Sequence, residues 1–297
     1  MGRLLGALVA LCACGAQAQQ SVSGGFFASQ DSDDFRESKQ TLGYTAASGW
    51  GARVGALRYT APGWSASGGL GAATYKQANA SRTIDASAGA ARVAGTTHWV
   101  GGLDYMEHVS AGTSLGLSVE RDLVNSIRGI DRGLHFTALA LVMDHAFSEQ
   151  FNVGVSAGTA LFSNDNNRPI LRTRWNYAIS ERFGLNAYLK TRSYHNTHAY
   201  RPEYFSPERL HEASLGLSSR FAVADAFVLS ASLEAGQQRI DGTSDPTWRA
   251  ALGAASRRNS AVQWFLGLEA SNTAPLFSGR AGGYRYTTVA GRVSVPL

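Results

Sequence analysis

Apolar and polar side chains alternate with a period of two residues over most of this chain. The pattern is clearest in residues 151–161 and 171–179, which are joined by residues 162–168. In the first segment, the mainly apolar face carries Phe151, Val153, Val155, Ala157, Thr159 and Leu161. In the second, that face carries Leu171, Thr173, Trp175, Tyr177 and Ile179, opposite Arg172, Arg174 and Asn176. Both segments are predicted to be β-strands with one face against hydrocarbon and the other in water.

Segments of this kind run from one end of the chain to the other, and we count about sixteen. The predicted strands cover residues 20–30, 39–47, 50–61, 64–77, 82–94, 98–108, 112–124, 133–145, 151–161, 171–179, 183–194, 212–220, 227–238, 248–254, 262–269 and 286–297. A soluble sandwich also contains half-buried strands, so the strands alone do not decide the fold class.

The connections between the predicted strands alternate in length. Brief ones, expected at the periplasmic side, cover residues 46–49, 108–112, 147–150, 180–182 and 257–260. Longer ones, expected outside the cell, cover residues 31–38, 122–132, 164–169, 195–207, 238–246 and 271–282, with short exceptions at 62–63 and 95–97. This alternation and the even strand number predict an all-β protein, an antiparallel transmembrane β-barrel of the bacterial outer membrane.

Composition agrees with a membrane-spanning barrel. Only 16% of the residues are charged, and the chain holds 33 Gly and 7 Pro. No window reaches the roughly 18 consecutive apolar residues that a membrane helix needs. If the protein lies in a membrane, it crosses it with strands.

The N-terminal residues predict export from the cytoplasm. Arg3 precedes an apolar run over residues 4–13 and an Ala16-Gln17-Ala18 site. We therefore expect a signal peptide over residues 1–18 and a single barrel domain over 19–297. Alternatively, residues 11–14 form a lipobox in which Cys14 is acylated. Cleavage after Ala18 removes both cysteines of the chain and leaves no thiol for a disulfide or a metal site.

Three motifs resemble the barrel domain of bacterial exopolysaccharide export porins. They are residues 118–126 (Ser-Val-Glu-Arg-Asp-Leu-Val-Asn-Ser), 162–168 (Phe-Ser-Asn-Asp-Asn-Asn-Arg) and 204–209 (Tyr-Phe-Ser-Pro-Glu-Arg). The group includes the C-terminal domain of the cellulose synthase export component and the poly-N-acetylglucosamine export porin. The resemblance covers roughly residues 99–297.

The sequence departs from this family pattern in two ways. It shows no helical repeat of about 34 residues, whereas the typical member carries a tetratricopeptide region. Asn164-Asp165-Asn166 also stands where Asp-Gly-Asn is expected. The resemblance implies polysaccharide export without covalent chemistry or a cofactor. The implied partners are the exported polymer, outer-membrane lipid, a periplasmic scaffold and an inner-membrane synthase.

Charged residues gather on the polar face of the predicted strands and are expected to line the lumen. This set is Glu120, Asp122, Arg172, Arg174, Lys190, Arg192, Glu212, Arg220, Glu234, Arg249, Glu269 and Arg292. Rings of donors and carboxylates can guide a hydroxyl-rich or anionic chain without holding it tightly. The alternative is that opposite charges brace the interior by cross-strand pairing.

Residues 200–207 contain two prolines and are predicted to fold as a lid over the external mouth. The lid residues are Tyr200, Tyr204, Phe205, Pro207 and Arg209. Together with Tyr188 and Tyr194, its aromatic rings can offer flat surfaces to sugar rings. Packing within the loop or the interfacial girdle is the alternative.

The same sequence features also allow other functions. A general porin or a plugged structural barrel would show the same strand pattern. A barrel-embedded hydrolase would need a site among Ser193, Ser206, His195, His198 and His211, whose spacing matches no nucleophile motif. A metal site at His195 and His198 lacks acidic or thiol ligands. The export signal and the interspersed charge, with a formal net charge of +5, argue against nucleic-acid binding.

Overall fold

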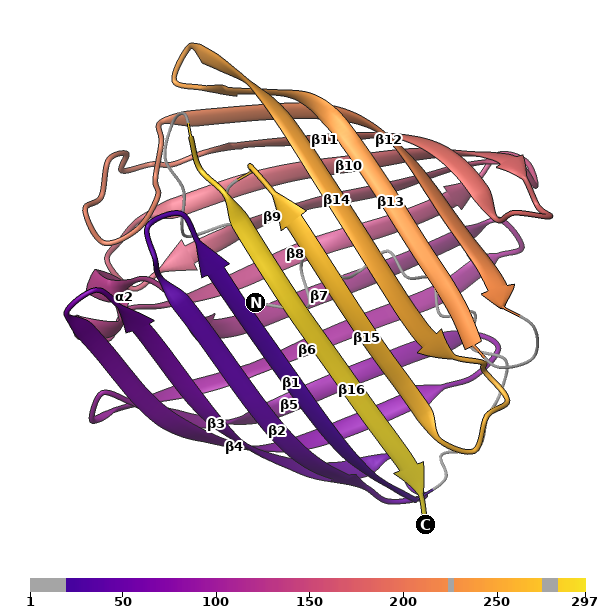
Figure 1. Cartoon of the computed structure of the whole chain (residues 1–297), viewed down its shortest axis with the longest axis horizontal. Coiled ribbons are helices and arrows are strands. Elements are labelled where there is room, and N and C mark those ends of the chain that lie inside the picture. Colours follow the sequence, from indigo (N-terminus) through magenta and orange to yellow (C-terminus); the bar gives the residue numbers. More distant parts are fainter. Residues whose placement is uncertain (1–19, 224–226, 274–282) are drawn as a thin grey trace.

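A computed structural model describes residues 20–223, 227–273 and 283–297. They form sixteen antiparallel strands and the short helix α2, Ile127–Asp131 (Figure 1). The strands are β1 Ser21–Asp31, β2 Arg36–Thr45, β3 Trp50–Ala61, β4 Trp64–Ala78, β5 Arg82–Val93, β6 Thr96–Ser110, β7 Thr113–Leu123, β8 His135–Ala146, β9 Phe151–Phe162, β10 Asn167–Ser180, β11 Leu185–His195, β12 Arg209–Val223, β13 Phe227–Ile240, β14 Thr243–Ser256, β15 Gln263–Ser271 and β16 Tyr286–Pro296. The predicted signal over residues 1–18 lies outside the described residues.

The sheet closes on itself because β1 pairs with both β2 and β16. The seam runs from Ser21 opposite Pro296 to Asp31 opposite Tyr286. Closure leaves no sheet edge, so the backbone groups of every strand find a partner on each side. The predicted fold class and strand number are confirmed.

The two faces of the wall differ as the alternation predicts. On β12, Leu215 is 68% exposed, whereas its neighbour Ser214 is 5% exposed. Large apolar side chains point outward around the barrel, among them Leu42, Val54, Leu141, Leu217, Leu233 and Leu252. An outer surface of this kind is stable only against hydrocarbon.

The brief connections lie at the end that holds Gln20, the first described residue, and Leu297, whose N–H donates to the Gln20 carbonyl. We assign this end to the periplasm because short turns mark that side of outer-membrane barrels. The predicted brief connections are confirmed at 46–49 and 147–150, and the one near 257–260 extends to residue 262. The exceptions are short as well: β3 and β4 are joined by residues 62–63 and β5 and β6 by residues 94–95.

One predicted outer loop, residues 238–246, is wrong. Strand β13 continues to Ile240 and β14 begins at Thr243, so only Asp241 and Gly242 connect them. Both residues have positive φ, 48° and 92°, as a two-residue hairpin turn requires. Pro246 therefore lies inside β14 rather than in a loop. The predicted loop at 271–282 falls largely on residues outside the described ones.

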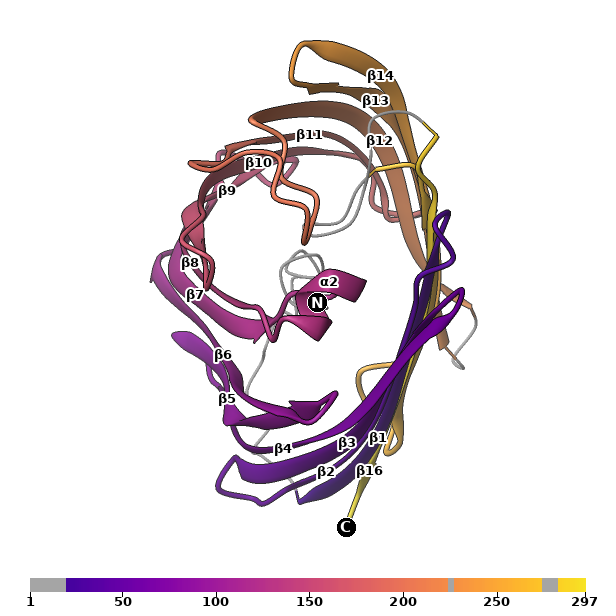
Figure 2. The same ribbon diagram turned by 90° about the vertical axis from the view of Figure 1, so that its left-hand side faces the viewer.

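Helix α2 folds into the barrel rather than out into solvent (Figure 2). The Ser126 side chain caps it by accepting from the Gly129 N–H. Ile130 is buried against Leu57 and Tyr59 of β3, among other apolar residues. The interior is therefore apolar on the β3–β6 side of the external end, and the polar lumen lies elsewhere. Within the described part of the chain, no helix is long and apolar enough to cross a membrane.

The orientation of the wall predicts opposite outcomes for neighbouring substitutions on β12. Leu217→Arg places a charge against lipid and is expected to lower the free energy of unfolding by about 2–4 kcal/mol. Ser218→Arg faces the interior and is expected to change it by about 0.5 kcal/mol. Denaturant unfolding in phospholipid vesicles measures both. Equal losses for the two variants would contradict the assigned faces.

Candidate functional site

The inward faces of β10 to β15 carry a wall of charged side chains. Register sets them side by side: Arg172 lies opposite Arg192, and Arg192 lies opposite Glu212. In the same way Glu234 of β13 lies opposite Arg249 of β14. Because barrel strands are tilted, such cross-strand rows run obliquely along the barrel axis. We refer to these residues, with Arg174, Lys190 and Glu269, as the charged wall.

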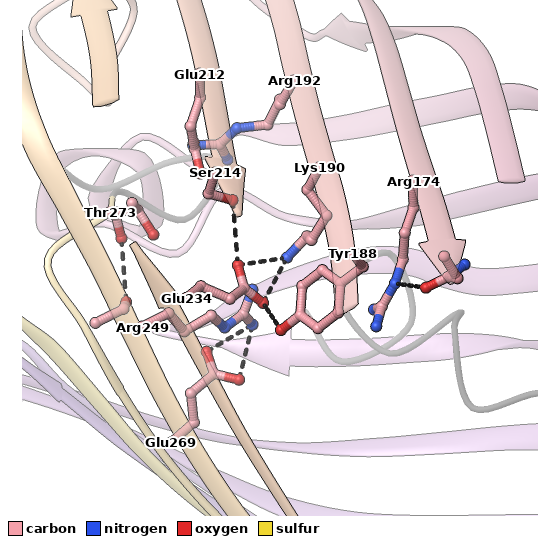
Figure 3. A network of polar contacts seen from close by, with 12 residues as sticks. Arg174, Tyr188, Lys190, Arg192, Glu212, Ser214, Glu234, Arg249, Glu269 and Thr273 are labelled. Carbon is pink, nitrogen blue, oxygen red and sulfur yellow. Dashed lines mark hydrogen bonds and ion pairs between the residues drawn. The ribbon is translucent and has the colours of Figure 1, made fainter. Parts of the chain in front are cut away.

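Ion pairs join most members of the charged wall (Figure 3). Arg192 Nη2 lies 2.5 Å from Glu212 Oε2, and Arg249 Nη2 lies 2.7 Å from Glu269 Oε1. Lys190 Nζ reaches past β12 to Glu234 on β13, at 3.0 Å. These side chains are half-buried, so the pairs are screened less than pairs in bulk water. Cross-strand bracing, one of the two alternatives from the sequence, is thus present.

Tyr188 contacts two members of the charged wall, Glu234 and Arg174. Its hydroxyl donates to Glu234 Oε1 at 3.0 Å, and the Arg174 guanidinium lies 4.0 Å from its ring centroid. A Cβ at Gly216 would clash with the Tyr188 ring, so only glycine leaves room for the ring there. Tyr188 is buried, as is Tyr194. These two rings therefore support arginines and do not offer free faces to a sugar.

The remaining predicted lumen residues lie on other strands or nearer the periplasmic end. Asp122 Oδ2 on β7 is 3.7 Å from Lys39 Nζ on β2, and Lys39 also pairs with Glu37 at 2.9 Å. Neither Lys39 nor Glu37 was predicted from the sequence to face the lumen, although both point inward on β2. Glu120 is buried on β7. Arg220 of β12 and Arg292 of β16 occupy inward positions near the periplasmic end and are exposed.

The β11–β12 loop, residues 196–208, is packed against the β9–β10 loop. The Tyr204 ring stacks on Phe162, with centroids 4.4 Å apart and planes 8° apart. Its hydroxyl donates to Asn164 Oδ1 at 3.1 Å and accepts from Asn166 Nδ2 at 3.0 Å. Burial raises the pKa of Tyr204, so this phenol stays protonated at neutral pH.

Arg168 of β10 links the β11–β12 loop to the end of β9. It is 0% exposed, and its guanidinium carbon lies 5.1 Å from the Phe162 centroid and 4.6 Å from the Tyr194 centroid. Its Nη2 donates to the Phe205 carbonyl at 2.7 Å and its Nε to Asn196 Oδ1 at 2.8 Å. Both Arg168 and Tyr204 belong to the motifs that carry the family resemblance, but sequence alone assigned no role to Arg168.

The β7–β8 loop, residues 124–134, holds the β11–β12 loop from the other side of the mouth. The Ser126 hydroxyl donates to the Glu203 carbonyl, and Arg132 pairs with the Glu203 carboxylate. Arg128 Nη1 contacts the Pro202 carbonyl at 3.5 Å. The β11–β12 loop and α2 thus meet inside the outline of the barrel (Figure 2).

The predicted lid residues take different positions within this loop. Tyr200 is 69% exposed and has φ of 57°. Phe205 is half-buried against Leu210 and the Tyr284–Tyr286 pair. Pro207 is buried, and its carbonyl accepts from Asn196 Nδ2. Arg209 begins β12 with an exposed side chain 3.7 Å from Glu208.

The serine and histidine residues considered for a hydrolase are only partly brought together. His211 Nδ1 lies 3.0 Å from Ser193 Oγ, on the outward face of β11 and β12. His198 instead contacts the Asp165 carbonyl, at 3.1 Å. A nucleophile site also requires a third group that orients the histidine. Among the described residues, no second hydrogen bond orients the His211 ring. In the described parts of the chain, no three His, Cys, Asp or Glu residues cluster as metal ligands do.

Comparison with known proteins gives no family by sequence. No family model matches the chain, and no curated protein matches it.

Solved structures share the fold at low sequence identity. A bacterial polysaccharide outer membrane secretin superposes with a TM-score of 0.72 at 13% identity, over 95% of this chain and 100% of that one. CdiB from Acinetobacter baumannii gives 0.52 at 10% identity, over 93% of this chain and 60% of that one. The outer membrane protein OprD from Pseudomonas aeruginosa gives 0.46 at 10% identity, over 94% of this chain and 93% of that one.

A closed antiparallel wall with lipid-compatible side chains outside is the architecture of outer-membrane barrels, and the polysaccharide secretin shares this fold. The protein is a sixteen-stranded β-barrel of the bacterial outer membrane.

Proposed function

We propose that the barrel passes a secreted polysaccharide across the outer membrane and performs no covalent chemistry itself. The observation that carries this proposal is the charged wall, which covers one side of the interior beneath a mouth that two loops cross. The fold of the polysaccharide secretin, matched over its whole length, supports the same function.

The pairing within the charged wall suits a polymer that must keep moving. An unpaired guanidinium in a partly dry channel would hold a passing anion or hydroxyl strongly. Arg192, Lys190 and Arg249 already have carboxylate partners, so each can offer only weak, exchangeable hydrogen bonds. Many weak sites in a row favour entry without preventing release. A neutral or weakly charged, hydroxyl-rich chain is the substrate class that fits.

The β11–β12 loop is proposed as the lid of this conduit. It is fixed to the β9–β10 loop through Arg168 and Tyr204, and to the β7–β8 loop through Glu203. The second attachment is the weaker one because the Arg132 side chain is 60% exposed. Opening is therefore expected to start at the Arg132–Glu203 contact, with Arg168 as the fixed end.

A general porin is the second candidate, because a polar, charge-paired lumen would also pass small hydrophilic solutes. The two functions differ in whether a polysaccharide enters the lumen. The periplasmic scaffold and the inner-membrane synthase remain proposals tied to export, since a conduit supplies no energy of its own.

Single-channel recordings in planar bilayers separate the two candidates. With a conduit, β-linked glucan or N-acetylglucosamine oligomers are expected to block the ion current. Arg174→Gln is expected to weaken this block several-fold, by removing a donor above Tyr188. Arg239→Gln, on the outward face of β13, is the matched control. Current without any oligomer block would favour the porin, and no current at all would indicate a plugged barrel.

Removing the fixed end of the lid is expected to release the loop without unfolding the barrel. Arg168→Met deletes hydrogen bonds to Asn196 and the Phe205 carbonyl, lowering the free energy of loop opening by about 2–3 kcal/mol. Protease cleavage within residues 196–208 should accelerate and the open-channel current should rise.

Arg239→Met, which removes an exposed arginine from the outward face of β13, serves as the control and should leave both readouts unchanged. Cleavage of Arg168→Met at the native rate would contradict the role assigned to Arg168.

A further inference from the structure

An open hollow of about 1000 Å³ lies on the outside of the wall, at the external ends of β1, β2, β3 and β16. Its lining is unusual for a lipid-facing surface, because it combines arginines with uncharged polar groups: Gln30, Arg36, Ser38, Arg58, Thr287 and Arg285. Except for Arg285, which lies just before β16, these residues share a face with the outward apolar side chains of their strands. For example, Arg58 lies between Leu57 and Tyr59, which are buried and face the interior, so the Arg58 side chain faces outward. The exposed Val54 and Trp50 lie on this same outward face of β3.

The hollow lies at the level of the outer leaflet. Arg58 is eight residues from Trp50 along β3, a rise of about 20 Å for a tilted strand. The apolar band of such barrels is about 25 Å tall, so Arg58 approaches its external border. Farther toward the periplasm, the same strands turn Leu42, Val54 and Phe26 outward. On β10, by contrast, the side chain at the corresponding level is apolar: Leu171 lies eight residues from Ile179, and both are exposed.

The side chains of three arginines, Arg36, Arg58 and Arg285, line this hollow. Among the described residues, no ion pair or side-chain hydrogen bond involves the guanidinium of Arg36, Arg58 or Arg285. A cation at the border of hydrocarbon is costly unless an anionic group lies against it. Hydroxyl and amide groups beside the arginines can complete the hydrogen bonds of such an anion.

The carboxylates near the hollow do not balance this charge. Asp31 is buried, and its Oδ1 accepts from the Asp33 and Phe35 N–H groups, at 2.9 and 3.0 Å. Glu37 faces the interior and pairs with Lys39. Asp34, at the tip of the β1–β2 hairpin, accepts from Gln30 Nε2 at 3.2 Å and is the one exposed carboxylate among the described lining residues. Asp33, on the same hairpin, is also exposed but does not line the hollow. Three guanidinium groups against the one exposed lining carboxylate therefore leave the lining with a net positive charge.

We propose that this hollow binds the phosphate groups of a phosphorylated glycolipid of the outer leaflet, that is, lipopolysaccharide. The arginines and hydroxyls would take the phosphorylated sugar, while its acyl chains would lie along the outward apolar residues below. A soluble phosphate would gain nothing from that apolar surface, which favours the lipid. This inference rests on the position of the barrel in the membrane and not on what the lumen carries.

A lipid bound in the hollow would contact the strands at which the barrel closes. It spans the seam at which β1 meets β16, together with β2 and β3. A ligand that contacts four strands and binds only the closed barrel stabilises closure by mass action.

Binding of diphosphoryl lipid A to the purified full-length barrel in detergent tests the proposal, with native mass spectrometry as the readout. The combined variant Arg36→Gln, Arg58→Gln and Arg285→Gln is expected to bind at least about tenfold more weakly. The control combines Arg82→Gln, Arg182→Gln and Arg239→Gln, which remove the same charge elsewhere. The control should bind as the native protein does, and dephosphorylated lipid A should bind the native protein weakly.

Several outcomes would overturn the proposal. These are native affinity in the combined variant, equal losses in both combined variants, or equal binding of dephosphorylated lipid A. Displacement of the lipid by inorganic phosphate at micromolar concentration would assign the hollow to a soluble anion instead. If the combined variant does not fold, Arg36→Gln and Arg58→Gln are measured singly, each with an expected loss of about threefold.

Discussion

The constraint on which the rest of this structure depends is the absence of water in the bilayer interior. A backbone N–H or carbonyl that faces lipid without a partner costs several kcal/mol, so every strand needs a neighbour on both sides. The β1–β16 seam meets this requirement, from Ser21 opposite Pro296 to Asp31 opposite Tyr286. Closure then fixes which side chains face lipid and which face the interior, and it confines charge to the interior or to the membrane borders.

Confinement of charge explains the character of the lumen. Arg192, Lys190 and Arg249 each lie against a carboxylate from a nearby strand, because interior charge must be paired or solvated. In the proposed conduit, the same pairing would weaken the hold of these side chains on a passing polymer. Bracing and conduction are therefore compatible properties of one set of residues, and the two interpretations of the charged wall do not exclude each other.

The external end is organised by contacts between loops instead of by the sheet. Arg168 and Glu203 hold the β11–β12 loop from opposite sides, and α2 fills the β3–β6 side of the interior. Segments that connect strands thus cross the external mouth, while the strands supply a rigid frame on which these segments are fixed.

Sequence alone determined the fold class, the strand number and the face on which Arg172, Arg174 and Arg192 lie, because a strand's side chains alternate and lipid tolerates only one of the two faces. It misjudged residues 238–246, where polar residues and Pro246 suggested a loop although the strands extend to a two-residue turn. Only the tertiary structure decided that Lys39 meets Asp122, that Arg168 joins two loops and that Arg36, Arg58 and Arg285 converge on one hollow. Periodicity along a chain encodes which way a side chain points, but contacts between distant segments depend on closure and loop packing, which no local pattern contains.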